Sequence, residues 1–232
     1  MRALLAAVLL AGTALAQPAD FVRIPPGSLG HTRFDRPFWM GTTEVTVRQF
    51  ARFVKATGYR TTAETANAPR TWKAAGYRVS ASQPVVYVTV KDAAAYCAWA
   101  GGRLPRDEEW EYAARAGATT RHYWGDAIDG RYLWYRANSE GRPHPVGTKL
   151  PNRWGLYDVE GNVWEWTMSE PVKGEPWANR RGASWIDCDE IESEPGRRNS
   201  PLIGLAIFFK IAVSYGHRYD DIGFRCLRDE AR

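Results

Sequence analysis

Two acidic side chains in the segment 155–167 have the spacing of a cation-binding loop. Asp158 and Glu165 lie on either side of the pair Gly161-Asn162. Because this pair favours a tight turn with positive φ, both carboxylates and several backbone carbonyls can converge on one hard cation such as Ca²⁺. The residues by themselves allow a second interpretation equally well: a turn anchored by its aromatic residues, with both acids in water.

The N-terminus has the pattern of a secretory signal. Arg2 precedes an apolar run over residues 3–15, which ends in an Ala-Leu-Ala cleavage site at 14–16. We expect residues 1–16 to be removed and residues 17–232 to form one exported domain, periplasmic or extracellular. No later segment reaches the roughly 18 apolar residues that a membrane span requires, so no span is predicted.

The charge of the chain says little about a partner. The formal net charge is +5, with acids and bases mixed along the sequence. Residues 131–136 combine basic and aromatic side chains that could stack on bases or sugars, but a half-buried strand more often has the same residues. An exported protein seldom meets nucleic acid, so we expect no nucleic-acid partner.

The cysteines suggest one bridge and one remaining thiol. Three cysteines in an oxidising compartment imply a single disulfide. If Cys97 and Cys226 pair, the bridge closes most of the domain and Cys188 keeps its thiol. Acidic residues surround Cys188 in the sequence, and their charge raises the pKa of a thiol, so we expect Cys188 to be a poor nucleophile.

The histidines do not indicate a catalytic or zinc site. His31, His122, His144 and His217 form no H-x-H or H-E-x-x-H pattern, and no serine lies in a G-x-S-x-G motif. We therefore expect each histidine to be structural or exposed.

Local signals predict three helices and few other elements. A capping box at Thr46 begins the first helix, which Gly58 ends. Thr89 and Asp92 together can start the second, which runs through Trp99, and the third runs from 106 or 107 to 116. We expect extended structure at 37–44, a surface loop at 61–83 and a short strand at 85–90. After Gly117 regular structure should be sparse, and we expect aromatic packing, by a chain that has eleven tryptophans in all, to hold this half together.

Several motifs together resemble the formylglycine-generating enzyme, or sulfatase-modifying factor, family. They occur in the family's order over nearly all of residues 17–232: Thr43-Glu44-Val45-Thr46, Asp92 to Gly101, Gly102-Arg103-Leu104-Pro105, Glu109 to Arg115, Gly155 to Thr167, Arg181 to Trp185, and Gly223-Phe224-Arg225-Cys226. The resemblance implies a single α+β domain with little regular secondary structure, related to the C-type lectin fold.

The resemblance also implies a disulfide and calcium sites. Family members with this pattern bond the cysteines at Cys97 and Cys226. They bind calcium through the residues matching Asp158 and Glu165 and the carbonyls of those matching Gly161 and Val163. A second family calcium site begins at Asn138, with the carbonyl of Ser139. The loop that completes it is shortened here, so we expect that site to be weak or lost, although Glu140 could compensate.

The chain departs from the family where copper binds. Members that oxidise a sulfatase cysteine hold copper with two cysteines spaced five apart, because a soft cuprous ion favours two thiolates. Asp187 stands at the first position and Glu192 at the second. If Cys188 replaced the first ligand, its partner would be Ser193. Copper is therefore not expected.

The resemblance nevertheless implies a retained pocket. Trp164 and Ser184 match pocket residues, Asp221 stands where catalytic members have asparagine, and Cys188 lies nearby in the sequence. We expect an exported, calcium-stabilised binding or scaffold protein for a protein or small-molecule ligand. The alternative is a divergent metal-dependent oxidoreductase, since relatives include siderophore-tailoring oxidases and iron-dependent sulfoxide synthases.

Overall fold

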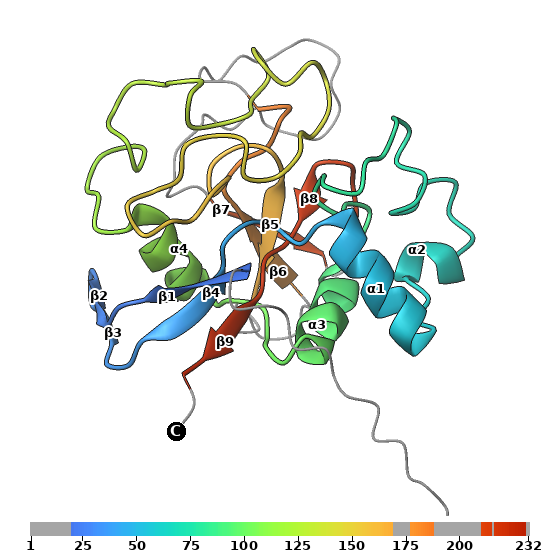
Figure 1. Cartoon of the computed structure of the whole chain (residues 1–232), viewed down its shortest axis with the longest axis horizontal. Helices are drawn as coiled ribbons and strands as arrows, with labels where there is room; N and C mark the ends of the chain where they lie inside the picture. The colour runs from blue at the N-terminus through green and yellow to red at the C-terminus, as the bar shows by residue number, and fades with distance from the viewer. Residues whose placement is uncertain (1–19, 169–176, 188–209, 215, 231–232) are drawn as a thin grey trace, which may run out of the picture.

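The computed structural model describes residues 20–168, 177–187, 210–214 and 216–230 (Figure 1). The expected signal peptide, residues 1–16, lies outside this part of the chain, as does Cys188. In the described residues, no helix combines the length and apolar character needed to cross a membrane.

The predicted helices form where the capping signals place them. The helices are α1 (Val47–Thr57), α2 (Thr62–Thr65), α3 (Val90–Trp99) and α4 (Asp107–Arg115). At the start of α1, the Gln49 amide donates to the Thr46 hydroxyl over 3.2 Å, while the Gln49 side chain accepts from the Thr46 amide over 2.8 Å. Gly58 ends the helix with a positive φ of 68°. The expected loop at 61–83 contains the short helix α2, which begins with its own capping box.

In the residues that the structure describes, the strands form three small sheets. A three-stranded antiparallel sheet has the order β1 (Phe21–Ile24), β4 (Phe38–Gly41), β9 (Leu227–Asp229). A hairpin joins β2 (Gly27–Leu29) and β3 (Thr32–Phe34). A four-stranded sheet has the order β7 (Lys210–Ser214), β6 (Trp177–Arg181), β5 (Trp164–Thr167), β8 (Ile222–Gly223). Within it, β5 and β8 pair in parallel, and the other pairs are antiparallel.

The prediction of a strand at 85–90 is wrong. Val85, Val86 and Val88 are buried, but the segment is irregular. The Val85 amide donates to the carbonyl of Val45, and the Tyr87 amide donates to the carbonyl of Tyr219. Because the segment bonds to two separate parts of the chain, and Tyr87 has a φ of +55°, no ladder forms.

Aromatic packing and one disulfide hold the core together. Trp110, Trp164 and Trp166 are among the largest fully buried side chains. Helix α3 packs against β5, and α4 packs against β6. Figure 1 shows α1 to α3 on one side of β5 and α4 on the other. The disulfide joins Cys97 in α3 to Cys226, as the resemblance implied.

The middle of the chain is irregular, as predicted. No helix or strand is assigned between α4 and β5, a segment that the structure describes throughout. Its loops gather at one end of the molecule, at the top of Figure 1. This segment contains most of the loop that was predicted to bind a cation.

Candidate functional site

The four-stranded sheet brings the expected pocket residues together. Trp164 begins β5, and its amide donates to the carbonyl of Asp221, which precedes β8. Arg180 lies in the neighbouring strand β6, with its guanidinium 4.8 Å from the centre of the Trp164 ring and 3.7 Å from the Asp221 carboxylate. Ser184 follows β6 and is fully buried. Of the four pocket candidates, only Cys188 lies outside the described residues.

Asp187 fills the position where the family's first copper thiolate is expected. It is 5% exposed. Its Oδ2 accepts from the amide of Ser184 over 2.8 Å and from the Ser184 hydroxyl over 2.9 Å. The carboxylate therefore closes the turn after β6, and it offers an oxygen where copper chemistry requires a sulfur.

The electrostatics of this pocket depend on burial. Burial raises the pKa of Asp221 to about 7, Arg180 opposes the shift, and the charges of Asp187 and Asp220 add to it. Burial also raises the pKa of Asp187, while hydrogen bonds from Ser184 lower it. Asp221 can therefore gain or lose a proton near neutral pH, a property that suits acid–base chemistry.

The sequence analysis did not identify Arg180 as a neighbour of Trp164 and Asp221. Its side chain faces the buried carboxyl group of Asp187, the partly buried carboxyl group of Asp221 and the Trp164 ring. The only signal in the sequence was a basic pair, Arg180-Arg181, in a segment that forms a buried strand.

The loop at 158–165 folds as the tight turn that its sequence predicts. Asp158, Gly161 and Asn162 have positive φ values of 53°, 84° and 57°. A Cβ on Gly161 would clash with the carbonyl oxygen of Trp134, so this close approach requires glycine. The Asn162 side chain holds the turn, because its Oδ1 accepts from the His144 amide over 2.8 Å.

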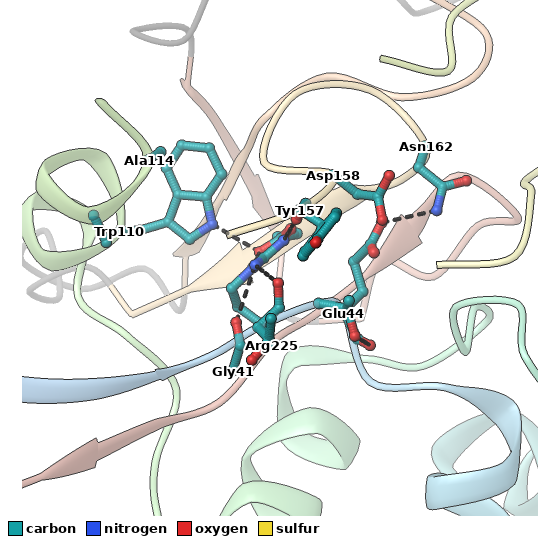
Figure 2. A network of polar contacts seen from close by, with 12 residues as sticks. Gly41, Glu44, Trp110, Ala114, Tyr157, Asp158, Asn162 and Arg225 are labelled. Atoms are coloured by element: carbon teal, nitrogen blue, oxygen red, sulfur yellow. Dashed lines mark hydrogen bonds and ion pairs between the residues drawn. The ribbon is translucent and has the colours of Figure 1, made fainter. Parts of the chain in front are cut away.

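Glu165 contacts Arg225 and Trp110, both of which Figure 2 labels. Its Oε1 accepts from Arg225 Nη2 over 2.6 Å, and its Oε2 accepts from Arg225 Nε and from Trp110 Nε1, each over 2.7 Å. Both Glu165 and Arg225 are buried, and breaking such a pair costs about 3–5 kcal/mol. A cation would have to compete with this guanidinium for the Glu165 carboxylate.

Asp158 contacts a second buried acid, Glu44, which sequence reasoning did not assign to a site. Asp158 Oδ2 accepts from the Gly147 amide over 2.6 Å, and Glu44 Oε1 accepts from Asn162 Nδ2 over 3.0 Å. Asp158 Oδ1 and Glu44 Oε2 are buried. No amide, hydroxyl or cationic group of the described residues donates a hydrogen bond to either oxygen. Burial and the nearby carboxylates raise the pKa of Glu44 well above its usual value, and burial raises that of Asp158 to about 6.

A cavity of about 200 Å³ lies beside Glu44. Glu44, Gly147 and Tyr157 line it near the acidic loop, and Tyr96 and Cys226 line it near the disulfide. The cavity is therefore a space next to Glu44, separate from the residues around Trp164.

Asn138 makes hydrogen bonds within its own loop. Its Oδ1 accepts from the Tyr135 amide over 2.9 Å, and its Nδ2 donates to the Leu133 carbonyl over 3.1 Å. The Ser139 carbonyl contacts His144 Nε2 at 2.8 Å, and Glu140 forms an ion pair with Arg142. These groups thus already have protein partners where the second calcium site was expected.

In the described part of the chain, no three His, Cys, Asp or Glu side chains gather as a metal-ligand set. The first predicted calcium set fits in part: Asp158 has an available oxygen, and Glu165 is held by Arg225. A cation there would need backbone carbonyls, water or Glu44 as further ligands.

Comparisons with known proteins agree with the motifs. Residues 7–230 match the family described as the sulfatase-modifying factor enzyme 1-like domain. The chain is 37% identical over 171 residues to inactive C-alpha-formylglycine-generating enzyme 2 of Mus musculus, covering 68% of this chain and 53% of the relative. It is 38% identical over 184 residues to the formylglycine-generating enzyme of Streptomyces coelicolor, covering 59% of each. The chain thus spans little more than half the length of these relatives.

Solved structures show the same fold. PvdO from Pseudomonas aeruginosa superposes with a TM-score of 0.69 at 24% identity, over 90% of this chain and 94% of PvdO. CarF superposes with a TM-score of 0.66 at 21% identity, over 91% of this chain and 98% of CarF. Because residues 7–230 match this family, the chain belongs to the sulfatase-modifying factor (formylglycine-generating enzyme-like) family.

Proposed function

We propose that this protein is an exported sulfatase-modifying-factor domain that binds a protein or small-molecule ligand and lacks the copper oxidase activity. The observation that carries the proposal is Asp187. A buried, hydrogen-bonded carboxylate stands where a cuprous ion needs a thiolate, and the position five residues further on is Glu192. Because oxygen donors are poor ligands for Cu(I), we expect the copper-dependent oxidation to be lost while the other pocket residues remain.

A relative supports this proposal. The mouse protein that matches this chain is named an inactive formylglycine-generating enzyme, so the family includes members without the activity. In the present chain, Trp164, Ser184, Arg180 and Asp221 form a largely buried cluster of aromatic, hydroxyl and charged groups. A few polar groups around an aromatic side chain are typical of ligand sites.

Calcium is part of the proposal as a structural ion. The tight turn at 158–165 and the available oxygen of Asp158 support it. Export is proposed from the signal-like sequence at 1–16, and the disulfide between Cys97 and Cys226 is consistent with an oxidising compartment.

The second candidate function is a metal-dependent oxidoreductase. One relative is named hercynine oxygenase, from Mycolicibacterium smegmatis; the match is 34% identical over 158 residues but covers only 33% of that protein. The observation in favour is Asp221, whose pKa of about 7 would let it transfer a proton beside a substrate.

The decisive experiment is a direct assay of the copper reaction. The purified protein would be incubated with copper and a cysteine-containing sulfatase peptide, with the Streptomyces coelicolor enzyme as a positive control, and the peptide analysed by mass spectrometry. We expect no aldehyde, and aldehyde formation would refute the proposal. Metal analysis of the purified protein separates the two candidates, because near-stoichiometric iron or copper would favour the oxidoreductase.

A further inference from the structure

We infer that Arg180 and Asp221 together bind the charged end of a free α-amino acid, with Arg180 donating to its carboxylate and Asp221 accepting from its ammonium group. This inference rests on the proposed ligand-binding function and names the class of ligand. Arg180 lies in β6 and Asp221 precedes β8, and these two strands lie on either side of β5 in one sheet. The two charged groups face one another, with Arg180 Nη1 3.7 Å from Asp221 Oδ2.

The first argument is the unused hydrogen-bonding capacity of Arg180. The residue is 8% exposed, and its Nε is buried without a hydrogen-bond partner in the described part of the chain. The separation of 3.7 Å from Asp221 is longer than a hydrogen bond, and Trp164 contacts the guanidinium only through the face of its ring. Burying such a donor without an acceptor costs free energy, and a ligand carboxylate would offset that cost.

The second argument distinguishes the two acids near Arg180. Asp187 Oδ2 accepts from the amide and the hydroxyl of Ser184, so this carboxylate already has protein donors. The ion-pair partner of Asp221 is beyond hydrogen-bond distance, and the Asp221 side chain is 14% exposed. Asp221 is therefore the acid that a ligand can reach, and it can accept from an ammonium group.

The third argument is charge. The guanidinium of Arg180 acts on the carboxyl groups of both Asp187 and Asp221. A ligand with only a carboxylate would add a further negative charge here, and a ligand with only an ammonium group would bring a cation next to Arg180. An α-amino acid carries both charges on neighbouring atoms and adds no net charge. Its two charged groups match a guanidinium and a carboxylate that lie side by side.

Partly buried aromatic side chains lie near the acid. Trp185 Nε1 donates to the carbonyl of Asp220 over 3.2 Å. Tyr77 and Tyr87 belong to the same hydrophobic cluster as Trp185. Burial raises the pKa of both tyrosines, and the charges of Asp220 and Asp221 add to the shift, so these rings lie close to the acids. We therefore expect amino acids with apolar or aromatic side chains to bind more tightly than glycine.

The competing arrangement is a protonated Asp221 that donates to a simple organic acid held by Arg180. Burial raises the pKa of Asp221 to about 7, so both of its protonation states are populated near neutral pH. An amino acid requires ionised Asp221 and should bind at least about tenfold more tightly at pH 7 than at pH 5, whereas a simple acid should bind more weakly at pH 7. Because burial also raises the pKa of Asp187 and Asp220, the reference for this comparison is Asp221→Asn.

The experiment follows thermal unfolding of the purified protein with each standard L-amino acid at about 10 mM, about ten times a Kd of 1 mM. A ligand that binds only the folded state should then raise the midpoint by about 3–5 °C. The best amino acid is compared by titration calorimetry with its analogues that lack the ammonium group or the carboxylate. For phenylalanine, these analogues are 3-phenylpropanoate and 2-phenylethylamine.

We expect the amino acid to bind at least about tenfold more tightly than either analogue, because each analogue leaves one charged group without its partner. Arg180→Gln and Asp221→Asn should each weaken amino-acid binding at least about tenfold, and Asp221→Asn should also abolish its dependence on pH between 5 and 7. The matched controls are Arg33→Gln and Asp35→Asn, which interrupt an ion pair on the surface and should bind as the wild type does.

Absence of a shift with every amino acid would overturn the inference, as would equal binding of the analogue without the ammonium group. A shift with an organic acid or an amine alone would support ligand binding and still overturn the amino-acid class. None of these results bears on the copper reaction, which the peptide assay tests separately.

Arg180→Lys provides a second test of the guanidinium if Arg180→Gln fails to fold. Lysine keeps the charge but lacks the planar, forked set of donors, and we expect amino-acid binding to weaken several-fold. Unchanged binding in Arg180→Lys, or in a folded Arg180→Gln, would contradict the role of Arg180.

Discussion

Arg225 and Glu165 form a bidentate ion pair, in which Nε donates to Oε2 over 2.7 Å and Nη2 donates to Oε1 over 2.6 Å. Both side chains are buried, and the remaining donors of Arg225 reach the carbonyls of Tyr157 and Gly41. The guanidinium thus ties β5 to the acidic loop and to the end of β4. Only a planar, forked donor can make all these contacts at once.

Replacing the Arg225 guanidinium should lower the stability of the fold. We expect Arg225→Lys to lower the free energy of unfolding by about 3 kcal/mol, because lysine keeps the charge but cannot satisfy both oxygens and both carbonyls. Urea unfolding measures the loss. The control is Arg33→Lys, since Arg33 pairs with Asp35 on the surface and such pairs contribute little. Equal effects of the two substitutions would contradict the structural role of Arg225.

The pocket acid Asp221 should make stability depend on pH. Its pKa is about 7 in the folded protein and 3.8 in the unfolded chain, so the folded state binds more protons between these values. The free energy of unfolding should therefore fall as pH rises from about 4 to 7 and level off above 7. The shift of about three pKa units corresponds to at most about 4 kcal/mol.

Asp221→Asn isolates this contribution, because other buried acids also titrate. We expect the stability of the wild type relative to Asp221→Asn to be greater at pH 5 than at pH 8. Urea unfolding at both values measures the difference. A difference that does not change with pH would show that Asp221 is ionised throughout this range.

Two thiolates should restore copper binding. In a Cys188→Ser background, we expect Asp187→Cys together with Glu192→Cys to bind Cu(I), because the two sulfurs then have the family's spacing of five. Competition with a colorimetric Cu(I) chelator measures the affinity. Glu192 lies outside the described residues, so its position follows from the sequence alone. Single replacements should bind much more weakly, and a wild type that binds as tightly would contradict the argument from Asp187.

The disulfide should contribute a large part of the stability. Cys97 and Cys226 are 129 residues apart, and closing such a loop stabilises by about 5 kcal/mol in the chain-entropy estimate. We expect Cys97→Ala with Cys226→Ala to lose a stability of this order in urea unfolding. Cys188→Ala is the matched control and should have a small effect. A comparable loss in the control would mean that Cys188 has a structural partner.

Features that depend on neighbouring residues could be predicted from the sequence. The helix starts at Thr46 and Thr89 follow from capping boxes, in which both partners lie within one turn. The turn at Gly161-Asn162 follows from the tolerance of these residues for positive φ. Even α2 had such a signal, because Thr61 and Glu64 have capping-box spacing. The relation to the C-type lectin fold stays a prediction.

Features that depend on distant partners could not be predicted in this way. The segment 85–90 is as apolar as a strand, but its hydrogen bonds go to Val45 and Tyr219. Glu44 belongs to a recognised motif, yet its burial beside Asp158 depends on contacts across more than a hundred residues. Arg180 is likewise a strand residue whose partner, Asp221, follows it by 41 positions.

The position of β8 and β9 in the topology has a consequence for biosynthesis. β8 pairs with β5 in one sheet, and β9 pairs with β4 in another, so residues 222–229 complete both. Neither sheet reaches its final set of strands until this segment has left the ribosome. We therefore expect the domain to fold only once residues 222–229 have been synthesised rather than progressively from its N-terminus, and a truncation that removes β8 and β9 to yield insoluble protein.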